Sequence, residues 1–148
     1  MISPEVLRGL PYFAGAGEES LKALAMGSEE RTFQAGQVLF REDQPAEQLY
    51  ILTRGEVDIQ YDLNTGEHRT VDTLVAGDLL VWSALVRPYR TTALGIARRE
   101  SAAIAIDARR LRELCDQDRE LGFSLMKEIA QTTSHRLEGA RVQLATRE

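Results

Sequence analysis

The sequence of 148 residues has one cysteine, four prolines and no long hydrophobic run. The single cysteine, Cys115, excludes an internal disulfide and cannot by itself hold an iron–sulfur cluster. No window approaches the roughly 18 consecutive apolar residues that a membrane span needs, and the N-terminus lacks the pattern of a signal peptide. We therefore expect a cytoplasmic protein with no membrane partner. Cys115 is expected to be a small buried side chain, with a reactive thiol sensor as the alternative.

Positive charge is also scarce, and the formal net charge is −5. A protein whose main partner is nucleic acid normally presents a basic face, because each neutralised phosphate releases counterions. The densest basic stretches, Arg98-Arg99 and Arg109-Arg110, are each followed closely by a glutamate. This pattern is typical of a solvated surface, so no direct nucleic-acid partner is expected.

Residues for catalysis or metal binding are few. The two histidines, His68 and His135, lie in separate segments, whereas a metal-dependent barrel needs clustered histidine and carboxylate ligands. No G-x-S-x-G elbow, P-loop or G-x-G-x-x-G is present, and Cys115 has no obvious paired base. The sequence argues against an enzyme, and we assign no catalytic residue and no metal ligand.

What the chain does contain is enough apolar sequence, 43% of its residues, for one core. Apolar residues at three- and four-residue spacing predict helices in residues 1–28, interrupted at Pro11, and again in residues 107–148. Between them, short strands alternate with turn signals at roughly eight- to twelve-residue intervals, which is typical of a sandwich or barrel. We expect one domain over residues 1–148, mainly β at 29–106 with flanking helices.

The longest helical segment covers residues 118–146, after a shorter helix for which Asp107 is a suitable N-cap. Its apolar and small residues follow the spacing of a coiled-coil seam, which consists of Met126, Ala130, Thr133, Leu137, Ala140 and Leu144. Small residues let two backbones approach closely, and a polar threonine can fix the register. We expect a homodimer through this helix, and the alternative is a helix that lies on its own domain.

The most specific segment is residues 77–92, which we call the cassette. It reads Gly77-Asp78-Leu79-Leu80-Val81-Trp82-Ser83-Ala84-Leu85 and, after a short loop, Arg90-Thr91-Thr92-Ala93. This segment resembles the phosphate-binding cassette of the cyclic-nucleotide-binding domain family, roughly Gly-Asp-x-x-Gly-Glu-x-Ala-Leu followed by Arg-Ser/Thr/Ala-Ala. Residues 36–42 and 49–57 resemble the family's first strand, turn and second hairpin. The resemblance covers almost the whole chain.

The resemblance implies an antiparallel β-roll of the double-stranded β-helix or jelly-roll type, with N-terminal helices and a long C-terminal helix. It also implies that the cassette binds cyclic AMP, cyclic GMP or another small anionic ligand. The ligand-binding residues carried over from the family are Gly77, Leu80, Val81, Trp82, Ser83, Arg90 and Thr91. Transcription factors of the family continue after the long helix into a helix-turn-helix, which is absent before Glu148, so the output is expected to pass through an unknown protein partner.

Arg90 is the residue expected to hold the anion. Its guanidinium can form a planar clamp beside the hydroxyl of Thr91, and residues 79–85 are expected to form a short helix whose first N–H groups favour an anion. The alternative is an ion pair between Arg90 and a nearby carboxylate. Because the loop before Arg90 is short, Arg87 competes for the same anion, and Arg141 on the long helix is a further candidate.

The main departure from the family is Val81-Trp82, where Gly-Glu is usual. In the family the glutamate accepts a hydrogen bond from the ribose 2′-hydroxyl, and an indole has no acceptor to replace it. Losing this partner costs about 1 to 3 kcal/mol, which predicts weak or altered binding. Trp82 can stack on a ligand, plug the pocket or pack in the core, and the bulk of Val81 favours a plug. A second departure is Asp43 in place of glycine, where we expect the turn to survive because Asp tolerates left-handed conformations.

Two functions are consistent with these residues. The first is a non-enzymatic regulatory sensor, which binds an anionic or nucleotide-like ligand and shifts the long helix. The second is a ligand-free β-roll dimer, in which Val81 and Trp82 occlude the pocket and the protein serves as a scaffold for other proteins.

Overall fold

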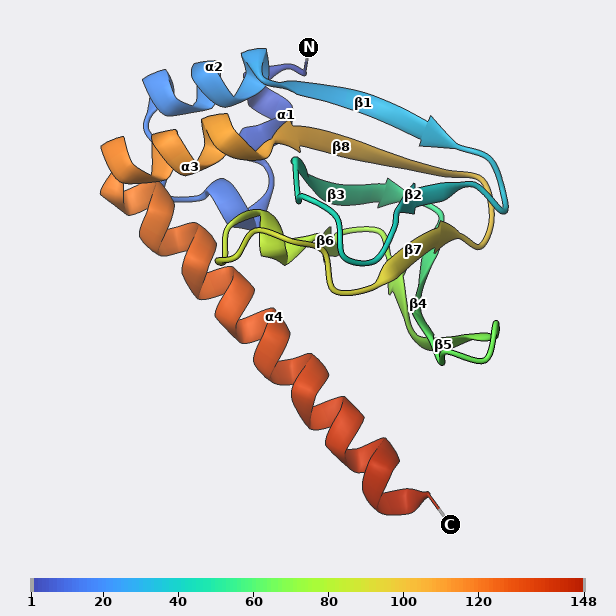
Figure 1. Cartoon of the computed structure of the whole chain (residues 1–148). Helices are drawn as coiled ribbons and strands as arrows, with labels where there is room; N and C mark the ends of the chain where they lie inside the picture. Colours follow the sequence, from blue (N-terminus) through green and yellow to red (C-terminus); the bar gives the residue numbers. More distant parts are fainter. Residues whose placement is uncertain (1, 148) are drawn as a thin grey trace.

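A computed structural model describes residues 2–147, and two antiparallel sheets form their centre. Each sheet has four strands, in the orders β1-β8-β3-β6 and β2-β7-β4-β5 (Figure 1). The strands are Ser28–Phe33 (β1), Val38–Phe40 (β2), Gln48–Arg54 (β3), Glu56–Asp62 (β4), His68–Val75 (β5), Leu79–Leu80 (β6), Leu94–Ala97 (β7) and Ser101–Asp107 (β8). The prediction of a mainly β fold with flanking helices, built as a β-roll, is confirmed.

Helices from both ends of the chain gather at one end of the roll (Figure 1). The bounds are Pro4–Arg8 (α1), Pro11–Phe13 (η1, a 3₁₀ turn), Glu18–Met26 (α2), Ala108–Gln117 (α3) and Arg119–Thr146 (α4). The break predicted at Pro11 is present, and Asp107 caps α3 by accepting from the backbone N–H of Arg110 at 2.9 Å. No helix in residues 2–147 combines the length and apolarity needed to cross a membrane.

The core is densest around β8, the strand that pairs with both β1 and β3. All residues from 101 to 106 are buried, without the alternation of a half-exposed strand. Three of them are alanines, Ala102, Ala103 and Ala105, whose small side chains let neighbouring elements approach the strand closely. Buried residues of β3 pack in the same core, among them Leu49 and Ile51, each fully inaccessible.

Two turns depend on left-handed backbone conformations. Asp43 has a φ of +54°, as expected for the residue that replaces glycine there. Gly55, between β3 and β4, has a φ of +89°, and a Cβ at this position would collide with the side chain of Ser101 and the carbonyl of Glu100. The hairpin from β3 to β4 therefore requires glycine on both conformational and steric grounds.

The start of the cassette differs from the prediction. We expected a helix over residues 79–85, but Leu79 and Leu80 form β6 and pair with Ile51 and Tyr50 of β3. A 3₁₀ turn (η2) follows and covers only Trp82–Ala84. Tertiary contacts override the local helical preference here. Both leucines are buried in the core, and a short strand that pairs with β3 places them there.

The long helix α4 begins in the core and ends away from it (Figure 1). Its N-cap is Asp118, whose carboxylate accepts from the N–H of Leu121 at 3.1 Å. Its buried residues are Leu121, Leu125 and Ile129, all near its beginning. With 28 residues the helix is about 42 Å long, because each residue adds about 1.5 Å.

Candidate functional site

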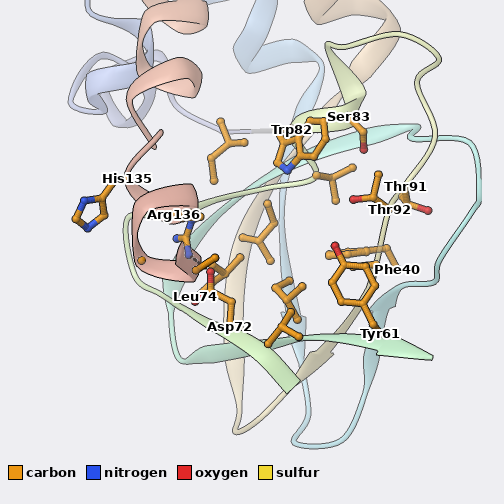
Figure 2. A pocket seen from close by; sticks show the side chains of 18 of the residues that line it. Phe40, Tyr61, Asp72, Leu74, Trp82, Ser83, Thr91, Thr92, His135 and Arg136 are labelled. Carbon is orange, nitrogen blue, oxygen red and sulfur yellow. Dashed lines mark hydrogen bonds and ion pairs between the residues drawn. The ribbon is translucent and has the colours of Figure 1, made fainter. Parts of the chain in front are cut away.

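A cavity of about 530 Å³ lies between the β2-β7-β4-β5 sheet, the cassette and the C-terminal half of α4. Three aromatic side chains line it from three different elements: Phe40 from β2, Tyr61 from β4 and Trp82 from η2. Figure 2 shows Trp82 on one side of the cavity, with Phe40 and Tyr61 together across from it. The volume falls within the roughly 300–1,000 Å³ of pockets that hold drug-sized ligands.

The structure brings most of the sequence-predicted ligand residues to this cavity. Leu80, Val81, Trp82, Ser83 and Thr91 all line it. The hydroxyl of Thr91 is engaged by the adjacent loop, since it donates to the carbonyl of Arg41 at 2.6 Å and accepts from the N–H of Gln44 at 2.9 Å.

Gly77 and Arg90 do not line the cavity. Gly77 has a φ of +96° in the turn before β6, and its carbonyl accepts from the hydroxyl of Tyr12 at 2.8 Å. Arg90 is held by Asp43: its Nε donates to the carboxylate at 2.8 Å and its Nη2 to the backbone carbonyl at 2.6 Å. This is the ion pair that the sequence left open as an alternative to anion binding. Arg87 and Arg141, the other candidate cations, are exposed and also lie outside the cavity lining.

Val81 keeps the turn that a glycine usually makes. Its φ of +66° and ψ of +52° are left-handed, which is rare for a β-branched residue and costs on the order of 1–3 kcal/mol. Its side chain is 9% exposed and lines the cavity. The backbone therefore retains the shape of the glycine turn, while the valine side chain adds apolar wall where glycine would leave open space.

Trp82 forms part of the wall on two sides. It lines the cavity and also a groove of about 280 Å³ under α4, together with Leu79, Ile129 and Leu137. Its side chain is 40% exposed, which is not the burial of a core residue. Because the cavity stays open beside it, Trp82 does not fill the pocket either, and occlusion by Val81 and Trp82 is not observed. The stacking role remains a prediction.

Sequence reasoning missed Arg136, the arginine that does line the cavity. From α4, its guanidinium forms ion pairs with Asp72 of β5 and, at 3.1 Å, with Asp78 before β6 (Figure 2 shows the approach to Asp72). The periodicity of α4 gave no signal for it, because the face that meets the roll depends on how the helix crosses the sheet. His135 also belongs to the lining, but its ring points away from the cavity (Figure 2).

The far side of the cassette is tied to α3. The Nη1 of Arg112 donates to the carbonyl of Ala84 at 2.6 Å, and its guanidinium lies over the ring of Tyr89, 4.2 Å from the centroid. A cation over an aromatic face is attractive, so one arginine holds both ends of the loop that follows η2. The cassette is thus connected to both C-terminal helices, through Arg112 to α3 and through Arg136 to α4.

Two side chains with shifted pKa values, Cys115 and Asp118, lie where α3 ends and α4 begins. Burial raises the pKa of the partly buried Cys115 thiol to about 11, with a further rise from Asp116 and Asp118. Hydrogen bonds from the Ser20 hydroxyl, at 2.6 Å, and from backbone N–H groups lower the pKa of the Asp118 carboxyl. A raised pKa disfavours the thiolate, which fits the packing role expected for Cys115 better than a reactive one. Nowhere in residues 2–147 do three or more His, Cys, Asp or Glu side chains group in a way that could hold a metal ion.

Comparisons with known proteins agree on one family. Its sequence profile, described as "Cyclic nucleotide-binding domain", matches residues 30–118. Among solved structures, a protein from Geobacter metallireducens described as a cyclic nucleotide-binding protein is 36% identical, with a TM-score of 0.81 over 93% of this chain and 99% of that chain. No curated protein matches the sequence.

Two regulators share the fold. The N-terminal domain of a transcriptional regulator from Streptomyces coelicolor is 25% identical, with a TM-score of 0.67 over 90% of this chain and 94% of that chain. The sensor domain of the transcriptional regulator DNR from Pseudomonas aeruginosa is 16% identical, with a TM-score of 0.75 over 90% of each chain.

Proposed function

Because the chain belongs to the cyclic nucleotide-binding domain family, a family of regulatory ligand-sensing domains, we propose that a small molecule in the cavity controls the position of α4. The observation that carries this proposal is the composition of the cavity wall. Five α4 residues share the lining with the cassette, Arg136, Gly139 and Ala140 among them. A ligand in the cavity therefore touches both at once, and it can shift α4 by binding one helix position better than another.

The family makes cyclic AMP and cyclic GMP the first ligands to test. Binding in the family's manner requires the guanidinium of Arg90 to leave Asp43 and turn toward the cavity. It also proceeds without a carboxylate for the ribose hydroxyl, since Trp82 stands in that position. We expect weak binding of cyclic nucleotides, and no catalysis. The cytoplasm remains the predicted location.

The output surface that we propose is a homodimer through α4. Three large seam side chains are exposed in the single chain: Met126 at 43%, Leu137 at 51% and Leu144 at 71%. A second copy of the chain, with the same seam spacing, is the simplest partner that covers them. Leu137 also lines the groove beside Trp82, which connects the seam to the cassette. A further protein partner then senses the geometry of the dimer.

The test is a binding titration that reads the fluorescence of Trp82, the only tryptophan of the chain. The probes are cyclic AMP, cyclic GMP and the neutral dye N-phenyl-1-naphthylamine. We expect at least one of them to bind. The sensing function is wrong, and the scaffold hypothesis takes its place, if neither nucleotide binds up to about 1 mM and the dye does not bind up to its limit of solubility. A dissociation constant of about 1 mM corresponds to only about −4 kcal/mol.

A matched pair of variants shows whether binding occurs in the cavity. A Cβ at Gly139 meets nothing within 4 Å, so the Cβ atom that Gly139→Phe and Gly139→Ala both introduce causes no clash. Both variants remove the same flexible glycine from α4, but only phenylalanine extends into the cavity. We expect Gly139→Phe to weaken binding at least about tenfold, a change of about 1.4 kcal/mol, and Gly139→Ala to leave it unchanged. Equal binding by both variants places the ligand elsewhere.

A further inference from the structure

We propose that the cavity selects an uncharged ligand with an aromatic body and disfavours anionic ligands, cyclic nucleotides included. This inference rests on the proposed sensing function and names the chemical class of its ligand. It depends on two observations. Arg90 of the cassette and Arg136 of the cavity lining are both already paired with carboxylates, and the cavity wall is mainly aromatic and aliphatic.

The charges at the α4 side of the cavity favour a neutral or cationic occupant over an anion. Among the described lining residues, Arg136 is the only lysine or arginine, and Asp72 lines the cavity beside it. The guanidinium bridges Asp72 and Asp78, so one positive charge faces two negative charges, and the cluster carries a net charge of −1. To bind Arg136, an anion must displace one of these two carboxylates. The other carboxylate stays beside the guanidinium and repels the anion, because both carry negative charge.

The cassette side of the cavity does not supply a substitute cation. Arg90 makes a fork to the side chain and the backbone carbonyl of Asp43, at 2.8 Å and 2.6 Å. Its backbone is also fixed, because Arg90 forms a β-bridge with Pro45. Turning the guanidinium inward breaks both of these hydrogen bonds, of which one joins it to the exposed Asp43 carboxylate and the other to a backbone carbonyl. An exposed ion pair of this kind contributes little stability, so the contact disfavours the inward position only modestly. The family's anion-binding residue thus makes its side-chain hydrogen bonds outside the cavity in this structure.

The walls match a flat apolar molecule. Phe40, Tyr61 and Trp82 present rings to one space, and aromatic rings prefer offset or edge-to-face contact with another ring. Apolar side chains fill the surface between them, namely Ile59, Val71, Leu74, Leu79, Leu80, Val81 and Ala93.

A few uncharged polar groups remain to orient such a ligand. The indole nitrogen of Trp82 points toward the cavity in Figure 2, and Ser83 and Thr92 bring hydroxyls to the lining. An indole N–H donates, and a hydroxyl both donates and accepts. One carbonyl or hydroxyl on an aromatic ligand is therefore enough to satisfy them.

The test compares two dyes that share one ring skeleton, N-phenyl-1-naphthylamine, which is neutral, and 8-anilino-1-naphthalenesulfonate, which carries a sulfonate. Energy transfer from Trp82 reports binding beside the cassette, and cyclic AMP is a third probe. We expect the neutral dye to bind the full chain at least about tenfold more tightly than the sulfonate, a difference of about 1.4 kcal/mol, and more tightly than cyclic AMP. Tighter binding of the sulfonate or of cyclic AMP overturns the inference but leaves the sensing function standing.

Two variants, each lacking one negative charge, test whether charge causes the preference for the neutral dye over the sulfonate, or whether the cavity simply prefers apolar molecules. Asp72→Asn weakens the carboxylate cluster on Arg136, whereas Glu138→Gln removes an exposed charge of α4 that lies outside the cavity lining. We expect Asp72→Asn to reduce the preference for the neutral dye about threefold or more, and Glu138→Gln to leave it unchanged. An unchanged preference in Asp72→Asn overturns the inference. If none of the probes binds the wild type, the proposed function itself fails.

Discussion

The two halves of α4 are in different surroundings. Residues 119–129 pack one face against the core, where Leu121 and Leu125 are fully buried. Residues 130–146 are mostly exposed, and they meet the roll at the cavity rim and through the ion pairs of Arg136. The first half is fixed by packing, which is insensitive to a small ligand. The second half meets the roll at the cavity, so under the proposed function a ligand acts on residues 130–146, the outer half of α4, and not on residues 119–129, the inner half.

The largest expected effect separates the two halves by stability. Leu125→Ala removes a fully buried side chain, and we expect the free energy of unfolding to fall by about 2–5 kcal/mol. Val142→Ala, in the outer half, changes a side chain that is 56% exposed and should alter it by no more than about 0.5 kcal/mol. Urea unfolding of both variants gives these values. Similar losses in both variants contradict the contrast.

Residues 119–129, the inner half of α4, should also protect the thiol of Cys115, which packs against them, from reaction with reagents in solution. Cys115 touches α4 where Gly122 passes, since a Cβ on this glycine would lie 3.4 Å from the cysteine Cβ. Burial raises the pKa of this thiol from an ordinary 9.0 to about 11. At pH 8 the thiolate fraction is therefore about a hundredfold lower than for an ordinary thiol, and reaction with a disulfide reagent slows accordingly. Reaction at the rate of an exposed cysteine, timed by absorbance, is the contrary result.

In the outer half, a charge in the seam should dissociate the proposed dimer. We expect the wild-type chain to sediment as a dimer at micromolar concentration. Leu137→Glu should raise the dissociation constant at least about tenfold, because the carboxylate loses its hydration in the interface. Val142→Glu introduces the same charge outside the seam and is the control. A wild-type chain that sediments as a monomer, or equal behaviour of the two variants, argues against the seam.

The smallest effect concerns the cap that begins the inner half. Asp118→Ala should cost about 1 kcal/mol at neutral pH, because the carboxylate caps α4 and accepts from Ser20. The pKa of Asp118 is lowered in the folded state, so its contribution is complete above the ordinary value of 3.8 and is lost as the pH falls through the lower, folded value. Urea unfolding at pH 7 and near pH 2 should show the difference between wild type and variant shrinking. A difference that persists unchanged at low pH contradicts this role.

Most elements could be predicted from the sequence, because they depend on local patterns. Asp107 begins α3 as the predicted cap, the spacing of strands and turns indicated a sandwich or barrel, and the family resemblance implied the β-roll. The helix predicted at 79–85 was wrong, because pairing with β3 overrides local helical preference in Leu79 and Leu80.

The candidate site was predictable only in part. The cassette resemblance identified five residues that line the cavity, Leu80 and Trp82 among them. The contact between Arg90 and Asp43, and the arrival of Arg136 at the cavity, depend on how a turn and a distant helix pack against the roll. Neither periodicity nor motif spacing carries that information.

The measurement that tests the account most directly is hydrogen exchange along α4 with and without N-phenyl-1-naphthylamine. At dye concentrations that saturate the Trp82 signal, we predict that amide exchange in residues 130–146 changes by about fivefold or more, while residues 119–129 keep their rates. The Gly139→Phe variant should show no such change in residues 130–146. Saturated binding in the cavity with unaltered exchange over residues 130–146 would contradict the claim that the cavity acts on the outer half of α4.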